Sequence, residues 1–327
     1  MKKLVALFLA AITLLSVVGC NNSETYQPDV PEFSCIHPMW MSNEETLPTV
    51  ETKNPSSETV RICKAIFDDL TKMYGIDKPL PELRLVTSKV NTNSLVYVPA
   101  IYQDNVLYFL IDDSHDALVA HELCHYLSDA GNGRVGFFHH VSGNNYTGHY
   151  LTEGITNHFS QKVCPFRLSD GLAIYSFETH IAKMLSIIYG EKYLEKDFFA
   201  ANVENLRRDF NTALQDSYGR LVQDCDVFDA FCGCIDAYTL NMLYAYNTLE
   251  PKALSNFQLL AIGIEEMLLI YASKKGCFEE AYAEFRKFSE TSYKDILIDF
   301  SELLQSVRWQ EKNELACKLI FLFFYSN

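Results

Sequence analysis

Apolar residues follow a mixed pattern in the first part of the chain and a helical pattern in the rest. From Ser57 they recur at spacings of three and four up to Tyr74, and Gly75 follows directly. That period predicts an amphipathic helix, and the glycine predicts its end. The segment Gln103-Asp104-Asn105 predicts a hairpin turn. Short apolar runs predict strands at 83–86, 95–101 and 106–111.

A capped helix is predicted after these strands. Asp113 and Ser114 are good N-cap residues, and Gly131 and Gly133 can end a helix, so the helix is expected over about 114–129. A loop rich in Gly and Asn comes next. Helical periodicity returns near Thr152 and dominates the remainder of the chain. Longer helices are predicted at 171–189, 201–221, 236–247 and 254–274.

This order of elements predicts an α+β fold, with a small mixed sheet packed on the helix at 114–129 and a mainly helical second half.

The net charge of the chain argues against one class of partner. The 327 residues carry a formal net charge of -15 at pH 7. Binding to nucleic acid depends on Lys and Arg releasing counterions from phosphates, so a nucleic-acid partner is not expected. We expect a monomer.

The N-terminus has the form of a targeting segment. Lys2 and Lys3 precede an apolar run from Leu4 to Val18, which is too short for a comfortable membrane span. The following Gly19-Cys20 resembles the lipobox of bacterial lipoproteins, in which the peptide is cut before the cysteine and the cysteine carries the lipid.

This resemblance implies an anchor in the lipid bilayer through acylated Cys20. It places the protein in the bacterial cell envelope, periplasmic or surface-exposed, with the outer membrane favoured. A plain secretory signal peptide with a chance cysteine is the alternative.

In an oxidising compartment several of the nine cysteines after Cys20 are expected to form disulfides. The odd number leaves at least one free, and Cys124 is the candidate, as a small buried apolar residue rather than a metal ligand or redox switch.

The central motif is His121-Glu122-Leu123-Cys124-His125. Residues four apart lie on the same face of a helix, so both imidazoles can bind one metal ion. Glu122 beside them can reach a water molecule on that metal, which is the geometry that metal-assisted hydrolysis needs. The motif predicts a catalytic metal site, and a structural or degenerate site is the alternative.

A catalytic zinc site needs a third protein ligand and an open position for water. Glu153, on the next predicted helix, offers that ligand. With it, residues 83–160 resemble the gluzincin metallopeptidases, in which a Glu from a following helix joins the two His of the motif. The resemblance implies one Zn²⁺ on His121, His125 and Glu153, with Glu122 as general base. His149, one turn before Glu153, is the competing third ligand.

The resemblance also implies roles around the metal. Asn157, one turn after Glu153, stands where a polar residue orients a ligating His. Many gluzincins carry Asp there, and an amide lacks the charge that raises ligand basicity. The donor that stabilises the oxyanion has three candidates, Tyr146, His149 and Tyr150. The strand at 107–111 is expected either to align an extended substrate at a sheet edge or to lie inside the sheet.

The implied fold is zincin-like. It divides the chain into a signal peptide at 1–19, a tether at 20–57, an α/β subdomain with the motif at 58–150 and a helical subdomain with the third ligand at 151–327. The implied function is zinc-dependent hydrolysis of a peptide or protein substrate, as an endopeptidase. The alternative is a non-catalytic surface lipoprotein that binds a peptide or glycan and keeps a vestigial zinc site.

Overall fold

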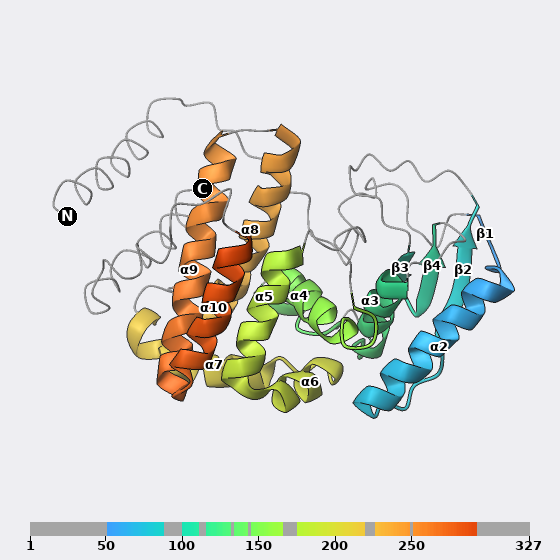
Figure 1. Cartoon of the computed structure of the whole chain (residues 1–327), viewed down its shortest axis with the longest axis horizontal. Helices are drawn as coiled ribbons and strands as arrows, with labels where there is room; N and C mark the ends of the chain where they lie inside the picture. Colours follow the sequence, from blue (N-terminus) through green and yellow to red (C-terminus); the bar gives the residue numbers. More distant parts are fainter. Residues whose placement is uncertain are drawn as a thin grey trace. The chain divides into compact units, whose positions relative to one another are not determined.

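The structure is a computed structural model with a mixed α+β fold in which helices predominate (Figure 1). The predicted signal peptide and Cys20 lie outside the part of the chain it describes, as does the predicted tether up to residue 50. The described residues are 51–87, 100–110, 116–131, 134–142, 145–165, 175–219, 226–248 and 251–292.

The first long helix, α2 (Ser57–Tyr74), begins and ends as the sequence predicts. Ser56 caps it by accepting a hydrogen bond from the Thr59 amide at 3.2 Å. Gly75 ends it with φ 63°, a left-handed conformation that costs a glycine no Cβ clash. The apolar residues on its buried face are Cys63, Ile66, Phe67 and Leu70.

Four short strands form a mixed sheet in the order β1-β2-β4-β3. The β2–β4 pair is parallel, and the other two pairs are antiparallel. The predicted hairpin is confirmed: Asp104 and Asn105 form its turn with φ of 51° and 66°, as in two-residue hairpin turns. The strands are β1 (Thr52–Lys53), β2 (Glu82–Val86), β3 (Ala100–Gln103) and β4 (Val106–Phe109).

The order of the strands decides between two predicted roles for residues 107–111. Because β4 lies between β2 and β3, the interpretation of this segment as a substrate-aligning edge is wrong, and the interpretation as an inner strand is right. Among the described strands, β3 is an edge strand, and it contacts α3 (Asp116–Leu127). Of the strand predicted at 95–101, only residues 100 and 101 are described.

The motif helix α3 is enclosed by its neighbours. It contacts α2 and β3, and every residue from Ala117 to Leu127 is buried. Leu123 shares one apolar core with Phe67 of α2 and Leu107 of β4. A helix surrounded in this way holds its side chains in fixed directions, which is the condition for a preorganised site. The predicted N-cap residues of this helix lie outside the described residues.

A two-stranded sheet, β5 (His139–Ser142) with β6 (Asn145–Thr147), leads into α4 (His149–Ser160). The sequence predicts a loop here because Gly and Asn are poor strand formers, and it predicts that the next helix begins near Thr152. Both expectations are wrong. The segment forms an antiparallel pair, and α4 begins at His149.

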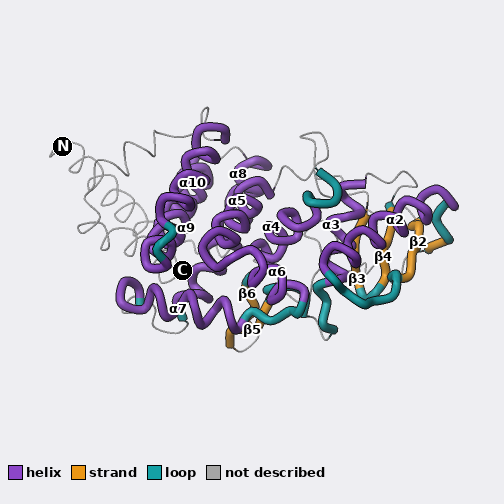
Figure 2. The backbone as a smooth tube through the Cα atoms, turned by 60° about the horizontal axis from the view of Figure 1, so that its bottom comes forward, coloured by secondary structure: helices purple, strands orange, loops and turns teal. Residues whose placement is uncertain are grey.

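The rest of the described chain is helical, as predicted (Figure 2). Helices α8 and α9 pack along each other, and α4 contacts α3, α5 and α8, so α4 links the motif helix to the helical half. The helix α8 begins earlier than the predicted position 236. The elements are α5 (Ser176–Leu185), η4 (Ser186–Gly190), α6 (Glu191–Phe199), α7 (Glu204–Tyr218), α8 (Val227–Thr248), α9 (Pro251–Lys275) and α10 (Phe278–Ser292).

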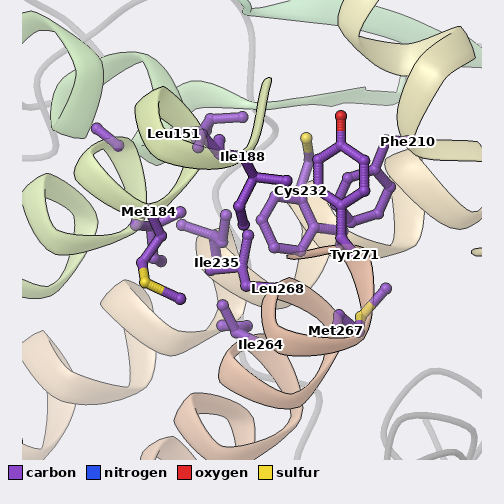
Figure 3. Packing of buried hydrophobic residues seen from close by; sticks show 14 of the residues in the cluster. Leu151, Met184, Ile188, Phe210, Cys232, Ile235, Ile264, Met267, Leu268 and Tyr271 are labelled. Atoms are coloured by element: carbon purple, nitrogen blue, oxygen red, sulfur yellow. The ribbon is translucent and has the colours of Figure 1, made fainter. Parts of the chain in front are cut away.

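One face of α4 belongs to the apolar core of this helical half. Leu151, Ile155 and Phe159, spaced four apart on α4, are fully buried in it. Figure 3 shows Leu151 in the same cluster as Ile235 of α8 and Leu268 of α9. Packing on this face sets the rotation of α4 about its axis. Among the described helices, none combines the length and apolar character needed to cross a bilayer.

Candidate metal centre

Three side chains from α3 and α4 meet at one point. His121 and His125 lie on successive turns of α3, and Glu153 approaches them from α4. The two Nε2 atoms are 3.0 Å apart. Oε2 of Glu153 is 3.1 Å from Nε2 of His121, and its Oε1 is 3.4 Å from Nε2 of His125. All three side chains are buried, and this is the group of potential metal ligands that stands out in the described part of the chain.

The spacing of these atoms fits a tetrahedral zinc ion. Bonds of about 2.0–2.1 Å at tetrahedral angles separate neighbouring donor atoms by about 3.3 Å. The observed separations of 3.0, 3.1 and 3.4 Å scatter around that value. Within the described part of the chain three ligands come together, which would leave a fourth position open on a tetrahedral ion.

Hydrogen bonds at the far sides of the imidazoles orient their lone pairs inward. Nδ1 of His121 lies 2.7 Å from Oδ1 of Asn157, a carbonyl oxygen, so this nitrogen donates and Nε2 is left as an acceptor. Oγ1 of Thr156 lies 3.4 Å from Nδ1 of His125. A bound metal ion, or a proton on one of the imidazoles, would offset the repulsion between nitrogen lone pairs and carboxylate oxygens that converge in a buried site.

Glu153 and His125 favour opposite charges. Burial acts to raise the pKa of Glu153, but the charge of the nearby His125 and the contacts with both imidazoles outweigh it and hold the pKa well below its ordinary value. Burial acts to lower the pKa of His125, and the charge and hydrogen bond of Glu153 reverse this to give a raised pKa. Glu153 is therefore a carboxylate, the form in which it can bind a metal.

Glu122 lies beside the cluster and is held by the sheet. Its Oε2 accepts a hydrogen bond from the backbone amide of Tyr102 in β3 at 2.7 Å. Burial raises the pKa of Glu122 above its ordinary range, although the two imidazoles and the Tyr102 amide act against it. A carboxylate with a raised pKa is better suited to taking a proton from water.

The outer contacts of both imidazoles come from α4. Asn157, predicted to orient a ligating His, contacts His121 as described above. Thr156, which contacts His125, is absent from the predictions, although it lies three residues after Glu153 and therefore on the same face of α4. The i, i+3, i+4 spacing of 153, 156 and 157 is the signal that could have identified it.

The predicted oxyanion donors have different surroundings, and the Glu153 carboxylate contributes, after burial and Asp236, to the raised pKa of Tyr150. Tyr146 is 47% exposed, and its ring stacks on Phe138 at 5.2 Å. His149 has its ring against those of Phe138 and Tyr150, and it is not part of the cluster of metal-ligating atoms. Tyr150 is buried, and its ring centroid is 6.3 Å from that of Tyr175.

Tyr175, which the sequence does not single out, lies near the site. Its ring is parallel to that of His121, with centroids 6.3 Å apart and an interplanar angle of 7°. Burial raises the pKa of Tyr175 well above its ordinary value, and the carboxylates of Glu153 and Glu122 add to the shift. The phenol therefore stays protonated and can donate. One Tyr among 19 carries no sequence signal for such a role.

Asp129, one turn after His125, and Cys124 have other surroundings than the metal cluster. The carboxylate of Asp129 accepts hydrogen bonds from the Tyr102 hydroxyl and from the Gly131 amide. Cys124 is a buried free thiol whose pKa is raised by burial, which agrees with the apolar interpretation. The expected disulfides are not found among the thiols of Cys63, Cys124, Cys164, Cys232 and Cys277.

The chain matches no protein-family model, and neither a curated protein nor a solved structure is significantly similar to it.

Proposed function

We propose that this protein is a zinc-dependent metallopeptidase of gluzincin type, with a zincin-like arrangement of the sheet, α3 and α4. The observation that carries the proposal is the convergence of His121, His125 and Glu153 at donor spacings that suit tetrahedral zinc, with Glu122 adjacent. A zinc ion bound there supplies a Lewis acid that polarises a carbonyl and lowers the pKa of water.

Glu122 serves as the general base. One of its carboxylate oxygens is held by the Tyr102 amide, which fixes the side chain on the β3 side of the cluster. Burial keeps its pKa raised, so the carboxylate takes a proton from the attacking water and later passes it to the leaving amine. No covalent intermediate on the protein is needed.

Tyr175 supplies the donor for the oxyanion, and β3 supplies the edge that aligns the substrate. The Tyr175 phenol stays protonated, and its ring centroid is 6.3 Å from that of His121, so we assign it the hydrogen bond to the oxyanion that develops on the substrate carbonyl. The strand β3 lies at an edge of the described sheet next to the motif helix, and an extended peptide can pair with such an edge. We therefore expect endopeptidase activity on peptides or proteins.

The proposal includes localisation at the bacterial envelope through a lipid anchor. Cleavage before Cys20 and acylation of that residue would anchor a monomeric enzyme to the bacterial envelope. Mass spectrometry of the purified N-terminal peptide tests this. Loss of the lipid in Cys20→Ser is the expected outcome, whereas an unmodified Cys20 would indicate a plain secretory signal.

The decisive experiment compares wild type with two buried Glu→Gln variants. Wild type should contain about one zinc per chain and cleave a mixed peptide library in a chelator-sensitive manner. Glu122→Gln should keep the zinc and lose cleavage. Glu265→Gln is the matched control, because Glu265 is buried on α9 and contacts His180 at 2.8 Å instead of the metal cluster.

Glu265→Gln should retain cleavage. Zinc binding with no cleavage in wild type would favour the alternative, a lipoprotein that binds a peptide or glycan with a vestigial metal site. Failure of wild type to bind zinc would overturn the metal site itself.

A further inference from the structure

The helix that carries Glu153 lacks a side-chain cap of its own. The residue at the N-cap of α4 is Gly148, and it has no side chain to accept hydrogen bonds from the first amides. Gly148 has φ 84°, and a Cβ there would lie 2.5 Å from the carbonyl oxygen of Phe137. Glycine is therefore required for the tight passage from β6 into α4, and the first amides of the helix need an acceptor from elsewhere.

That acceptor is Asp236 of α8. Its Oδ2 accepts from the Thr147 hydroxyl at 3.0 Å and from the Gly148 amide at 3.1 Å. Its Oδ1 accepts from the Tyr150 amide at 3.0 Å. One carboxylate thus accepts three hydrogen bonds at the entry into α4, and it lies at the positive end of the helix dipole.

The carboxylate also fixes the position of α4 relative to the helical half. Glu153 follows Tyr150 by three residues, about one turn along the same helix. Any shift or rotation of the first turn moves Glu153, and with it Thr156 and Asn157, against the imidazoles of α3. Metal ligands must be held to about 0.5 Å for full affinity, so the entry into α4 has to be fixed at its first turn.

We propose that Asp236 is a positioning residue for the metal centre, which holds Glu153 in place by capping α4 from α8. The inference rests on the proposed zinc site, but it concerns metal binding and can be tested without any peptidase substrate.

The test measures zinc affinity and the cobalt absorption spectrum of the full-length protein. Asp236→Asn keeps the side-chain volume but turns an NH₂ group toward backbone and hydroxyl donors. The matched control is Asp226→Asn: Asp226 precedes α8 and accepts from the Asp229 amide at 2.8 Å and from Nε of Arg207 at 2.6 Å. Both substitutions remove an Asp that accepts from the first turn of a helix, but only Asp236 contacts the helix of Glu153.

Asp236→Asn should weaken zinc binding about 10–100-fold, as is usual when a residue that orients a metal ligand is changed, and should shift the visible cobalt bands. Asp226→Asn should lower thermal stability and leave both metal readouts at the wild-type values. Thr147→Val removes one of the three hydrogen-bond donors to the Asp236 carboxylate and should weaken zinc binding several-fold. If Asp236→Asn does not fold, this variant tests whether Asp236 positions the metal centre.

Equal losses of zinc affinity in Asp236→Asn and Asp226→Asn would overturn the inference, because general destabilisation would then explain both. Unchanged affinity in Asp236→Asn, or in Thr147→Val where that variant has to decide, would overturn it as well. A wild-type protein that binds no zinc would instead overturn the proposed function, so the two failures are distinguishable.

Discussion

Oδ1 of Asn157 lies 2.7 Å from Nδ1 of His121, while the amide nitrogen of the same side chain is buried and has no hydrogen-bond partner among the described residues. A carboxylate at this place would make the same contact and avoid the unpaired amide donor. The neutral Asn157 amide thus orients the His121 imidazole, and its own nitrogen is left buried without a partner in the described part of the chain.

This contact gives the first prediction. Asn157→Asp should tighten zinc binding above pH 7, because a carboxylate on Nδ1 increases the basicity of Nε2. Asn157→Ala should weaken zinc binding about 10–100-fold, because the imidazole loses its orienting partner. Competition with a chromophoric chelator measures both.

Asn211→Ala controls for the loss of a side-chain amide that accepts one hydrogen bond, since the half-buried Asn211 accepts from the Phe228 backbone amide at 2.8 Å and is not part of the metal cluster. If Asn157→Ala and Asn211→Ala bind zinc as tightly as wild type, the orienting role of Asn157 is wrong.

Zinc should also stabilise the fold. A ligand that binds only the folded state adds about 2.7 kcal/mol of stability at a concentration a hundred times its Kd. Thermal or urea unfolding with and without zinc should therefore separate for wild type. Glu153→Gln keeps the shape of the side chain but loses its charge, so its two curves should nearly coincide. A zinc-dependent shift of wild-type size in that variant would show that the metal binds elsewhere.

Gly154 allows α4 to approach α5 closely. A Cβ at this position would lie 2.2 Å from the carbonyl oxygen of Glu178, which is backbone and cannot move aside cheaply. Gly154→Ala should therefore lower the free energy of unfolding by about 1–3 kcal/mol and displace Glu153, with a loss of zinc affinity. Urea unfolding and zinc titration measure the two effects.

Gly75→Ala separates packing from backbone strain. Gly75 has φ 63° and nothing within 4 Å of the position of a Cβ, so its substitution carries only the left-handed penalty of about 1 kcal/mol. Zinc affinity should stay unchanged in Gly75→Ala. Equal zinc affinities in Gly75→Ala and Gly154→Ala would contradict a role for the close contact of α4 and α5.

The elements that the sequence predicts well are those whose signals are local. Ser56 and Gly75 cap α2 from within the same segment, and Asp104-Asn105 forms its turn from its own φ preferences. The four-residue spacing of His121 and His125 is likewise local, since a helix alone places both on one face.

The beginning of α4 illustrates why the rest is not predictable. Its N-terminus is capped by Asp236, which lies 86 residues after Tyr150 and has no signature in the sequence around His149. Tyr175 reaches His121 only because α5 packs on α4, so its place in the site is likewise a tertiary property. Pairing of β5 with β6 depends on contacts that the polar composition of the segment does not reveal.

Glu178 makes the stability of the metal-free protein depend on pH. It is fully buried on α5, accepts a hydrogen bond from the Thr239 hydroxyl, and has its pKa raised to about 7 by burial, with a further contribution from Glu153. The unfolded chain releases this proton near the ordinary value of 4.5. Between these two values the folded state holds more protons than the unfolded state, so stability falls as pH rises.

The decline should begin near pH 4.5 and flatten above about pH 7, with a total on the order of 3 kcal/mol at most. Urea unfolding of chelator-treated protein at a series of pH values measures it. Glu178→Gln stays neutral in both states and should lose this part of the slope. Glu204→Gln, at a side chain that is 63% exposed, should keep the wild-type slope. A Glu178→Gln protein whose stability falls with pH as steeply as wild type would mean that the buried carboxyl is already ionised at pH 5, and that the surroundings on α5 and α8 solvate its charge.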